Sequence, residues 1–413
     1  MKRLKNRTII LPIGAKKYHQ IIDNKLLYKK EIDGLIEQYP EIFPSNIRLG
    51  YSFLGHSKND LKLPIPRRMI RIKNSFNSYE DFLLHPCFIL PYLKGITKEI
   101  SEGLILRKYN VPYHAIATKE GKNAMFWYRL ELALSQYNIV GTTIKRKANL
   151  PKHLLIDEHH TKLSNNKIYI CTTIGLDCFL GANVSPSMRY EDLKKAYGVF
   201  KEEIQNKYPN YSPRSINIDG YKSTKKTVKN LFPTTGILRC FLHAFLKIRN
   251  CGTKAYDLYF NEVATLVWNC YYANNKRAFA QRIAHLKYWT LQFVPNSPFK
   301  GAILSLCAKK QEFIHLYDYP NGRKTSNMLD RLMKFQDRRL YASQNFHGTL
   351  PSANAAVRAH ALLINFCPYS TQTIHNKGGI NSPFEQVNGF VYRKNWLENL
   401  LVAASLGGNK IYL

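Results

Sequence analysis

The chain has 413 residues, of which 61 are Lys or Arg and 28 are Asp or Glu, so its formal net charge is +33. With 45% apolar residues it has enough hydrophobic material for a sizeable core, which excludes a disordered chain and predicts more than one domain. Such an excess of positive charge predicts a polyanionic partner, and nucleic acid is the natural candidate.

The lengths of the apolar runs indicate whether the chain enters a membrane or is secreted. The longest, Ile89–Leu93 and Asn399–Gly408, are too short to span a bilayer, and the apolar run near the amino terminus is too short for a signal peptide. Eight cysteines without a C-x-x-C pair are typical of reduced thiols. We therefore expect a soluble cytoplasmic protein with no membrane partner.

The first 150 residues carry basic clusters but no recognisable chemistry. Residues 1–94 mix short apolar runs with prolines and predict an accessory module. Residues 95–150 predict three short helices, the first interrupted at Val111-Pro112. They form either a helix-turn-helix DNA-binding unit or an ordinary helical hairpin packed on the core.

Residues 151–249 give the clearest pattern. Three strands are predicted in succession over 153–185, followed by a helix over 191–208, a short strand over 215–220, a basic helix and a strand-to-helix segment from Gly236. This order predicts an α/β fold of ribonuclease H-like topology, a mixed sheet with helices on both faces.

The remaining chain is predicted to be helical. Residues 250–320 form a mostly helical insertion, and residues 321–413 complete the core, beginning with a helix at Thr325. The segment from Ser382 either completes the core or contacts a partner.

Two aspartates fall where a metal site would need them. Asp157 interrupts an apolar run in the first predicted strand, and Asp219 ends the fourth. Because the first and fourth strands of this topology are neighbours, we expect both carboxylates side by side, an arrangement that is unfavourable without a cation. The alternative for Asp219 is a turn or helix-capping aspartate, since Asp-Gly is a common turn pair.

A third acid is expected from a helix that returns to the sheet, because two-metal phosphoryl transfer needs convergent carboxylates. Asp330 lies in the first turns of the helix that begins at Thr325, and it is the preferred candidate. Glu385, in SPFEQVNGF, is the alternative. Cys240 and His243 are metal-ligand types spaced for one helix face, but two ligands do not make a zinc site, so packing or contact with nucleic acid is the better interpretation.

Taken together, these residues resemble the DDE/D transposases of the bacterial insertion-sequence and Mutator-like group. The resemblance covers about Leu154 to Tyr369 and rests on DEHHT, NIDGYKSTKKTVKNLFP, RCFLHAFLKI and TSNMLDRLMKFQDRR. It implies that Asp157 and Asp219 bind catalytic metal and that Cys240 and His243 mark a helix beside the site. The third acid of this group is usually Glu, so Asp330 is a departure from its pattern.

The resemblance also implies an activity and partners. We expect two Mg²⁺ ions, with Mn²⁺ as a substitute, to support cleavage of element ends and strand transfer in a homo-oligomer on DNA, in the bacterial cytoplasm at the nucleoid. The DNA partners would be the element ends and the target. Four residues of the basic helix are expected to contact DNA, namely Lys222, Lys225, Lys226 and Lys229. The alternatives are an inactive or domesticated DNA-binding protein and a structure-selective nuclease on the same fold.

Overall fold

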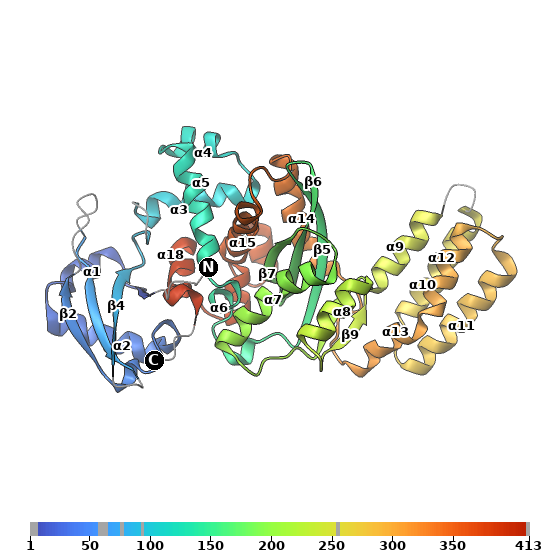
Figure 1. Cartoon of the computed structure of the whole chain (residues 1–413), viewed down its shortest axis with the longest axis horizontal. Coiled ribbons are helices and arrows are strands. Elements are labelled where there is room, and N and C mark those ends of the chain that lie inside the picture. Colours follow the sequence, from blue (N-terminus) through green and yellow to red (C-terminus); the bar gives the residue numbers. More distant parts are fainter. Residues whose placement is uncertain (1–6, 57–64, 75–77, 92–94, 253–256, 410–413) are drawn as a thin grey trace.

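The protein has an α/β fold with two mixed sheets, seen in a computed structural model that describes residues 7–56, 65–74, 78–91, 95–252 and 257–409. Figure 1 shows an elongated molecule with a small sheet at one end, a larger sheet in the middle and a helical bundle at the other end. The basic stretch over residues 2–6 lies outside the described residues.

The amino-terminal region is a four-stranded sheet with strand order β1-β4-β3-β2. β1 is parallel to β4, and the other pairs are antiparallel. This sheet was not predicted, because β1 is only four residues long and its partner β4 lies more than 70 residues later in the chain. Its strands and accompanying helices are β1 (Thr8–Leu11), β2 (Tyr51–His56), β3 (Arg68–Lys73), β4 (Tyr79–Pro86), α1 (Ala15–Ile21) and α2 (Lys25–Gln38).

The middle sheet has five strands in the order β7-β6-β5-β8-β9. β5, β6 and β7 form an antiparallel meander, while β8 and β9 continue the sheet parallel to β5. The expected adjacency of the first and fourth strands of this region is therefore confirmed. The elements are β5 (His153–Leu163), β6 (Asn166–Gly175), β7 (Cys178–Ser185), α7 (Tyr190–Lys207), β8 (Ser215–Ile218), α8 (Lys222–Leu231) and β9 (Gly236–Arg239).

Successive side chains of β5 point to opposite faces of the sheet, and each face packs against a different core. Leu154 and Ile156 belong to a core shared with α7 and α8, whereas Leu155 belongs to the core on the opposite face. His159 shares the face of Leu155, and its Nε2 lies 3.1 Å from Asp337 on α14 (Asn327–Ala342). The face that carries residues 155, 157 and 159 is therefore covered by α14.

The helices over residues 95–150 pack onto the molecule. α4 and α5 are joined by a short turn, and α5 buries Trp127 and Glu131. This packing of α5 is what the helical-hairpin alternative predicts. Contact between DNA and the exposed residues of α5 stays a prediction. The helices are α3 (Thr97–Ile105), α4 (Tyr113–Glu120), α5 (Ala124–Ala133) and α6 (Ile139–Thr143).

The predicted helical insertion has its own apolar core. It forms the bundle at the right of Figure 1. The bundle begins before the predicted boundary at residue 250, because α9 (Phe241–Cys251) already contributes to its core. Among the described residues, the helices that follow are α10 (Asp257–Tyr271), α11 (Lys276–Phe293), α12 (Pro298–Ala308) and α13 (Lys310–Ile314).

The carboxyl-terminal helices join the small sheet to the rest of the molecule. Ser405 Oγ accepts from the Ile10 amide at 3.1 Å and donates to the Ile42 carbonyl at 2.7 Å. The segment from Ser382 therefore completes the core of this chain. After α14, the helices are α15 (Leu350–Phe366), α16 (Thr371–Asn376), α17 (Pro383–Asn388) and α18 (Trp396–Ala403). Within the described ranges, no helix combines the length and apolar character needed to cross a bilayer.

Candidate acidic active site

Asp157 and Asp219 occupy equivalent places on neighbouring parallel strands. His153 of β5 is paired with Ser215 of β8, so each aspartate lies four residues beyond a paired position. Asp157 is within β5, and Asp219 comes directly after the last residue of β8. The sheet therefore places the two aspartates beside each other where β8 ends, as expected from the adjacency of the two strands.

The charges of the two other acids act on Asp157. The pKa of Asp157 is raised from 3.8 to about 6: burial is the main cause, the charges of Asp219 and Asp330 add to it, and His243 opposes it. Asp157 is thus a carboxylate whose ionised form is disfavoured by its surroundings. A bound cation would relieve that cost.

Asp330 reaches this region from the first turn of α14. Its Oδ2 accepts a hydrogen bond from Ser326 Oγ at 3.1 Å, and Ser326 Oγ lies 3.4 Å from the Cys240 thiol. Asp337, two turns further along the same helix, contacts His159 on β5. α14 therefore runs along β5 with both aspartates directed toward the sheet.

Two predicted alternatives have clear structural positions. Asp219 Oδ1 accepts the Tyr221 amide at 2.9 Å, so this residue also fulfils the turn role considered from the sequence. Glu385 lies in the first turn of α17, where its Oε2 accepts from the Asn381 amide at 2.7 Å. It is not among the groups whose charge acts on Asp157, whereas Asp330 is.

Cys240 and His243 lie at the beginning of α9, beside the acids. His243 Nε2 is 3.9 Å from Asp157 Oδ2. The pKa of His243 is raised from 6.5 to about 9: the Cys240 side chain is the largest cause, Asp157 and Asp219 act in the same direction, and burial of the ring opposes them. His243 is therefore positively charged at neutral pH. Burial raises the pKa of Cys240, but the ring of His243 outweighs it and the net pKa is lowered.

The three acids are of the ligand type that Mg²⁺ binds, but their side chains do not yet surround a common metal position. Carboxylate oxygens are the ligands that Mg²⁺ prefers, and Asp157, Asp219 and Asp330 supply them from three elements. Within the part of the chain that the structure describes, however, no three His, Cys, Asp or Glu side chains are gathered closely enough to hold an ion as they stand. Each of the hydrogen bonds given above for Asp219 and Asp330 uses one carboxylate oxygen, so lone pairs remain on both groups for a metal ion.

Glu158 is a buried acid that sequence reasoning missed. It faces away from Asp157, and its Oε1 accepts from Tyr197 of α7 and Thr224 of α8, both at 2.8 Å. It thereby connects β5 to the basic helix. Its place in DEHHT was visible, but the two hydroxyl donors are 39 and 66 residues away.

Cationic side chains also surround the acids. A cavity of about 130 Å³ is lined by Asp219 and His243 together with Arg239, Lys247 and Lys309. Gly220 has φ of +96°, which favours glycine, and a Cβ there would lie 2.6 Å from Arg239 Cζ, so a larger residue would also displace the Arg239 guanidinium. The predicted DNA-contacting lysines of α8, Lys222, Lys225, Lys226 and Lys229, are all exposed.

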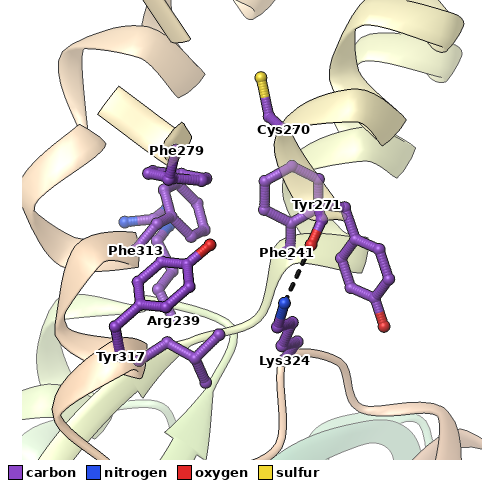
Figure 2. Close-up of a pocket in the computed structure, with 9 residues that line it drawn as sticks. Arg239, Phe241, Cys270, Tyr271, Phe279, Phe313, Tyr317 and Lys324 are labelled. Carbon is purple, nitrogen blue, oxygen red and sulfur yellow. Dashed lines mark hydrogen bonds between the residues drawn. The ribbon is translucent and has the colours of Figure 1, made fainter. Parts of the chain in front are cut away.

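An aromatic pocket positions the start of α9 (Figure 2). Phe241 and Phe313 pack edge to face at 5.4 Å, and Lys324 donates to the Tyr271 carbonyl at 3.0 Å. The Phe241 amide donates to the Lys324 carbonyl at 3.0 Å. This contact ties α9, which carries His243, to the segment that leads into α14.

Comparison with known proteins adds no assignment to this geometry: no family model matches the chain, and no curated protein shows significant sequence similarity to it.

Proposed function

We propose that the protein is a Mg²⁺-dependent DNA strand-transfer enzyme of the transposase kind, built on a ribonuclease H-like core. The main support for the proposal is that Asp157 and Asp219 lie next to each other on adjacent parallel strands. The charge of Asp330, on α14, also contributes to the raised pKa of Asp157. The strand order β7-β6-β5-β8-β9, with helices on both faces, supports the proposed core.

Asp157, Asp219 and Asp330 would hold two Mg²⁺ ions, or Mn²⁺ in their place. Bound metal supplies a lowered pKa for an attacking water or 3′-hydroxyl and charge stabilisation at the phosphorus. The side chains of the protein would orient the phosphate and balance the charge at the site. His243, positively charged beside Asp157, would offset the excess negative charge and donate a hydrogen bond to a phosphate oxygen.

The cations around the acids supply a path for the DNA backbone. The exposed lysines of α8 follow directly after Asp219 in the chain. Arg239, Lys247 and Lys309 line the cavity that Asp219 and His243 share. Phosphate contacts of this kind fix the position of DNA without reading its sequence. Assembly of several copies on the DNA ends is part of the proposal.

One observation favours a second candidate, a DNA-binding protein without catalysis. Within the described residues, no three His, Cys, Asp or Glu side chains are gathered closely enough to hold an ion as they stand. A structure-selective nuclease is distinguished from a transposase by its products, since only the transposase joins a 3′ end to a new strand.

The test uses a plasmid that carries the gene together with its natural flanking DNA, incubated with the protein and Mg²⁺ or Mn²⁺. We expect end cleavage and joined products, and we expect Asp219→Ala to abolish both while DNA affinity is retained. Asp337→Ala is the matched control, because Asp337 is half exposed on α14 and contacts His159. Normal cleavage by Asp219→Ala would refute the site, and DNA binding without cleavage by the wild type would favour the second candidate.

A further inference from the structure

A second, larger cavity lies between α8, β9 and α13. Its volume is about 390 Å³, within the range of pockets that hold small ligands, roughly 300–1,000 Å³. The charged side chains that line it are Lys225, Lys229 and Arg239, with Glu312 as the acid. Cations therefore outnumber acids along its wall, which suits an anionic ligand.

The carboxylate of Glu312 stands between two of these cations. It lies 2.5 Å from Arg239 Nη1 and 3.4 Å from Lys225 Nζ. Burial raises the pKa of Glu312, but Arg239 and Lys225 outweigh it, so the net pKa is lowered and the group is ionised. An anion from the insertion is thus already paired with cations of the sheet region.

The backbone under Glu312 is fixed by its neighbour. Phe313 is buried in the aromatic pocket, where it packs on Phe241 at 5.4 Å and Phe279 at 6.5 Å (Figure 2). The side chain of Glu312 can therefore move without displacing α13. A substitution that removes only its charge should leave the fold intact.

Arg239 joins this cavity to the acidic site. It lines both the 390 Å³ cavity and the 130 Å³ cavity that contains Asp219. Guanidinium groups bind a phosphate and a carboxylate with the same fork geometry. A phosphate in the larger cavity would compete with Glu312 for Arg239.

We infer that the cavity between α8, β9 and α13 binds a backbone phosphate of nucleic acid, and that Glu312 occupies the phosphate position in the free protein. The inference rests on the proposed DNA-binding function, to which it adds a defined subsite. Glu312 is then an internal competitor that lowers affinity until a phosphodiester displaces it.

A purely structural clamp would behave differently. If Glu312 only holds the insertion against α8 and β9, removing its charge would loosen the cavity and leave DNA affinity equal or weaker. If Glu312 competes with phosphate, the same change strengthens binding. It also steepens the salt dependence, because the vacated cations now attract counterions that phosphate must release.

The experiment measures the affinity of full-length protein for a fluorescent DNA duplex of random sequence, in EDTA and over a series of NaCl concentrations. Glu312→Gln is compared with Glu262→Gln, which removes the same charge from an exposed position on α10 of the same insertion. We expect about two- to five-fold tighter binding by Glu312→Gln alone, the range of a partly exposed ion pair, and a salt slope steeper by about one. A second arm titrates both variants with inorganic phosphate by calorimetry.

The two arms separate the sources of phosphate and the two proposals. A gain by Glu312→Gln over Glu262→Gln in the DNA arm supports the subsite on nucleic acid. If Glu312→Gln gains affinity only for inorganic phosphate and the wild type does not bind DNA, the anion-binding site is supported and the proposed function is refuted. Equal behaviour of the two variants in both arms would overturn the inference.

Discussion

Glu131→Gln tests the buried ion cluster that connects α5 to α14, the helix that carries Asp330. Glu131 is fully buried, and its carboxylate accepts from Arg107 Nε at 2.7 Å, from Tyr113 Oη at 2.8 Å and from Arg339. Gln has nearly the same shape but no charge. The substitution therefore leaves two buried guanidinium groups without their counter-ion.

The size of the effect follows from the pKa. Burial would raise the pKa of Glu131, but Arg339 and Arg107 outweigh it and lower the pKa from 4.5 to about 2. A shift of this size corresponds to about 3 kcal/mol of stability, since one pKa unit is about 1.4 kcal/mol. Removing one partner of a buried pair costs roughly 3–5 kcal/mol in other proteins, which agrees.

The sign with pH is fixed by the same shift. Because the folded-state pKa lies below the unfolded value, the stabilisation is fully present above pH 4.5 and is lost as the pH falls toward 2. The difference between wild type and Glu131→Gln should thus be largest at pH 7 and smaller at pH 3.

The assay is urea denaturation followed by tryptophan fluorescence, for which Trp127, one turn from Glu131 on α5 and 1% exposed, is a nearby reporter. Asp81→Asn is the control, because it breaks the Arg71–Asp81 pair, which has similar geometry but lies at the surface. We expect a much smaller loss from it. Equal losses in the two variants, or a loss from Glu131→Gln that does not change between pH 7 and pH 3, would refute the reasoning.

Three further predictions concern the site. Gly220→Ala should weaken the affinity for DNA, because the new Cβ displaces Arg239. Gly378→Ala is the control: Gly378 also has a positive φ, but no atom lies within 4 Å of the new Cβ. Equal DNA affinities of the two variants would contradict the role of Arg239. Thr224→Val should lower the free energy of unfolding by about 1–3 kcal/mol, because Glu158 loses a donor, and thermal unfolding measures this. Lys226→Ala should reduce the slope of log affinity against log salt by about one, and an unchanged slope would exclude a phosphate contact.

The sequence predicted the central sheet well because its signals are local. Alternation and β-branched residues mark β5, whose bounds are those expected, and the position of Asp219 at the end of a short apolar strand needed no long-range information. The adjacency of β5 and β8 came from topological rules rather than from any single residue. Asp157 and Asp219 could therefore be paired before the structure was known.

What the sequence could not predict depends on contacts between distant segments. β1 of the small sheet is only four residues long, and it pairs with β4 more than 70 residues later. Arg239 meets Glu312 across 73 residues, and Glu131 meets Arg339 across 208. Periodicity identifies buried faces, but it does not identify which buried charge is opposite which.

Whether Asp157, Asp219 and Asp330 hold catalytic metal can be seen in a crystal soaked in Mn²⁺ and measured for anomalous scattering. We expect peaks at these three carboxylates, with two ions about 3.5–4 Å apart, and loss of the peaks in Asp157→Asn. Absence of Mn²⁺ from these carboxylates at saturating concentration, or peaks bound by Glu385 in place of Asp330, would contradict this assignment.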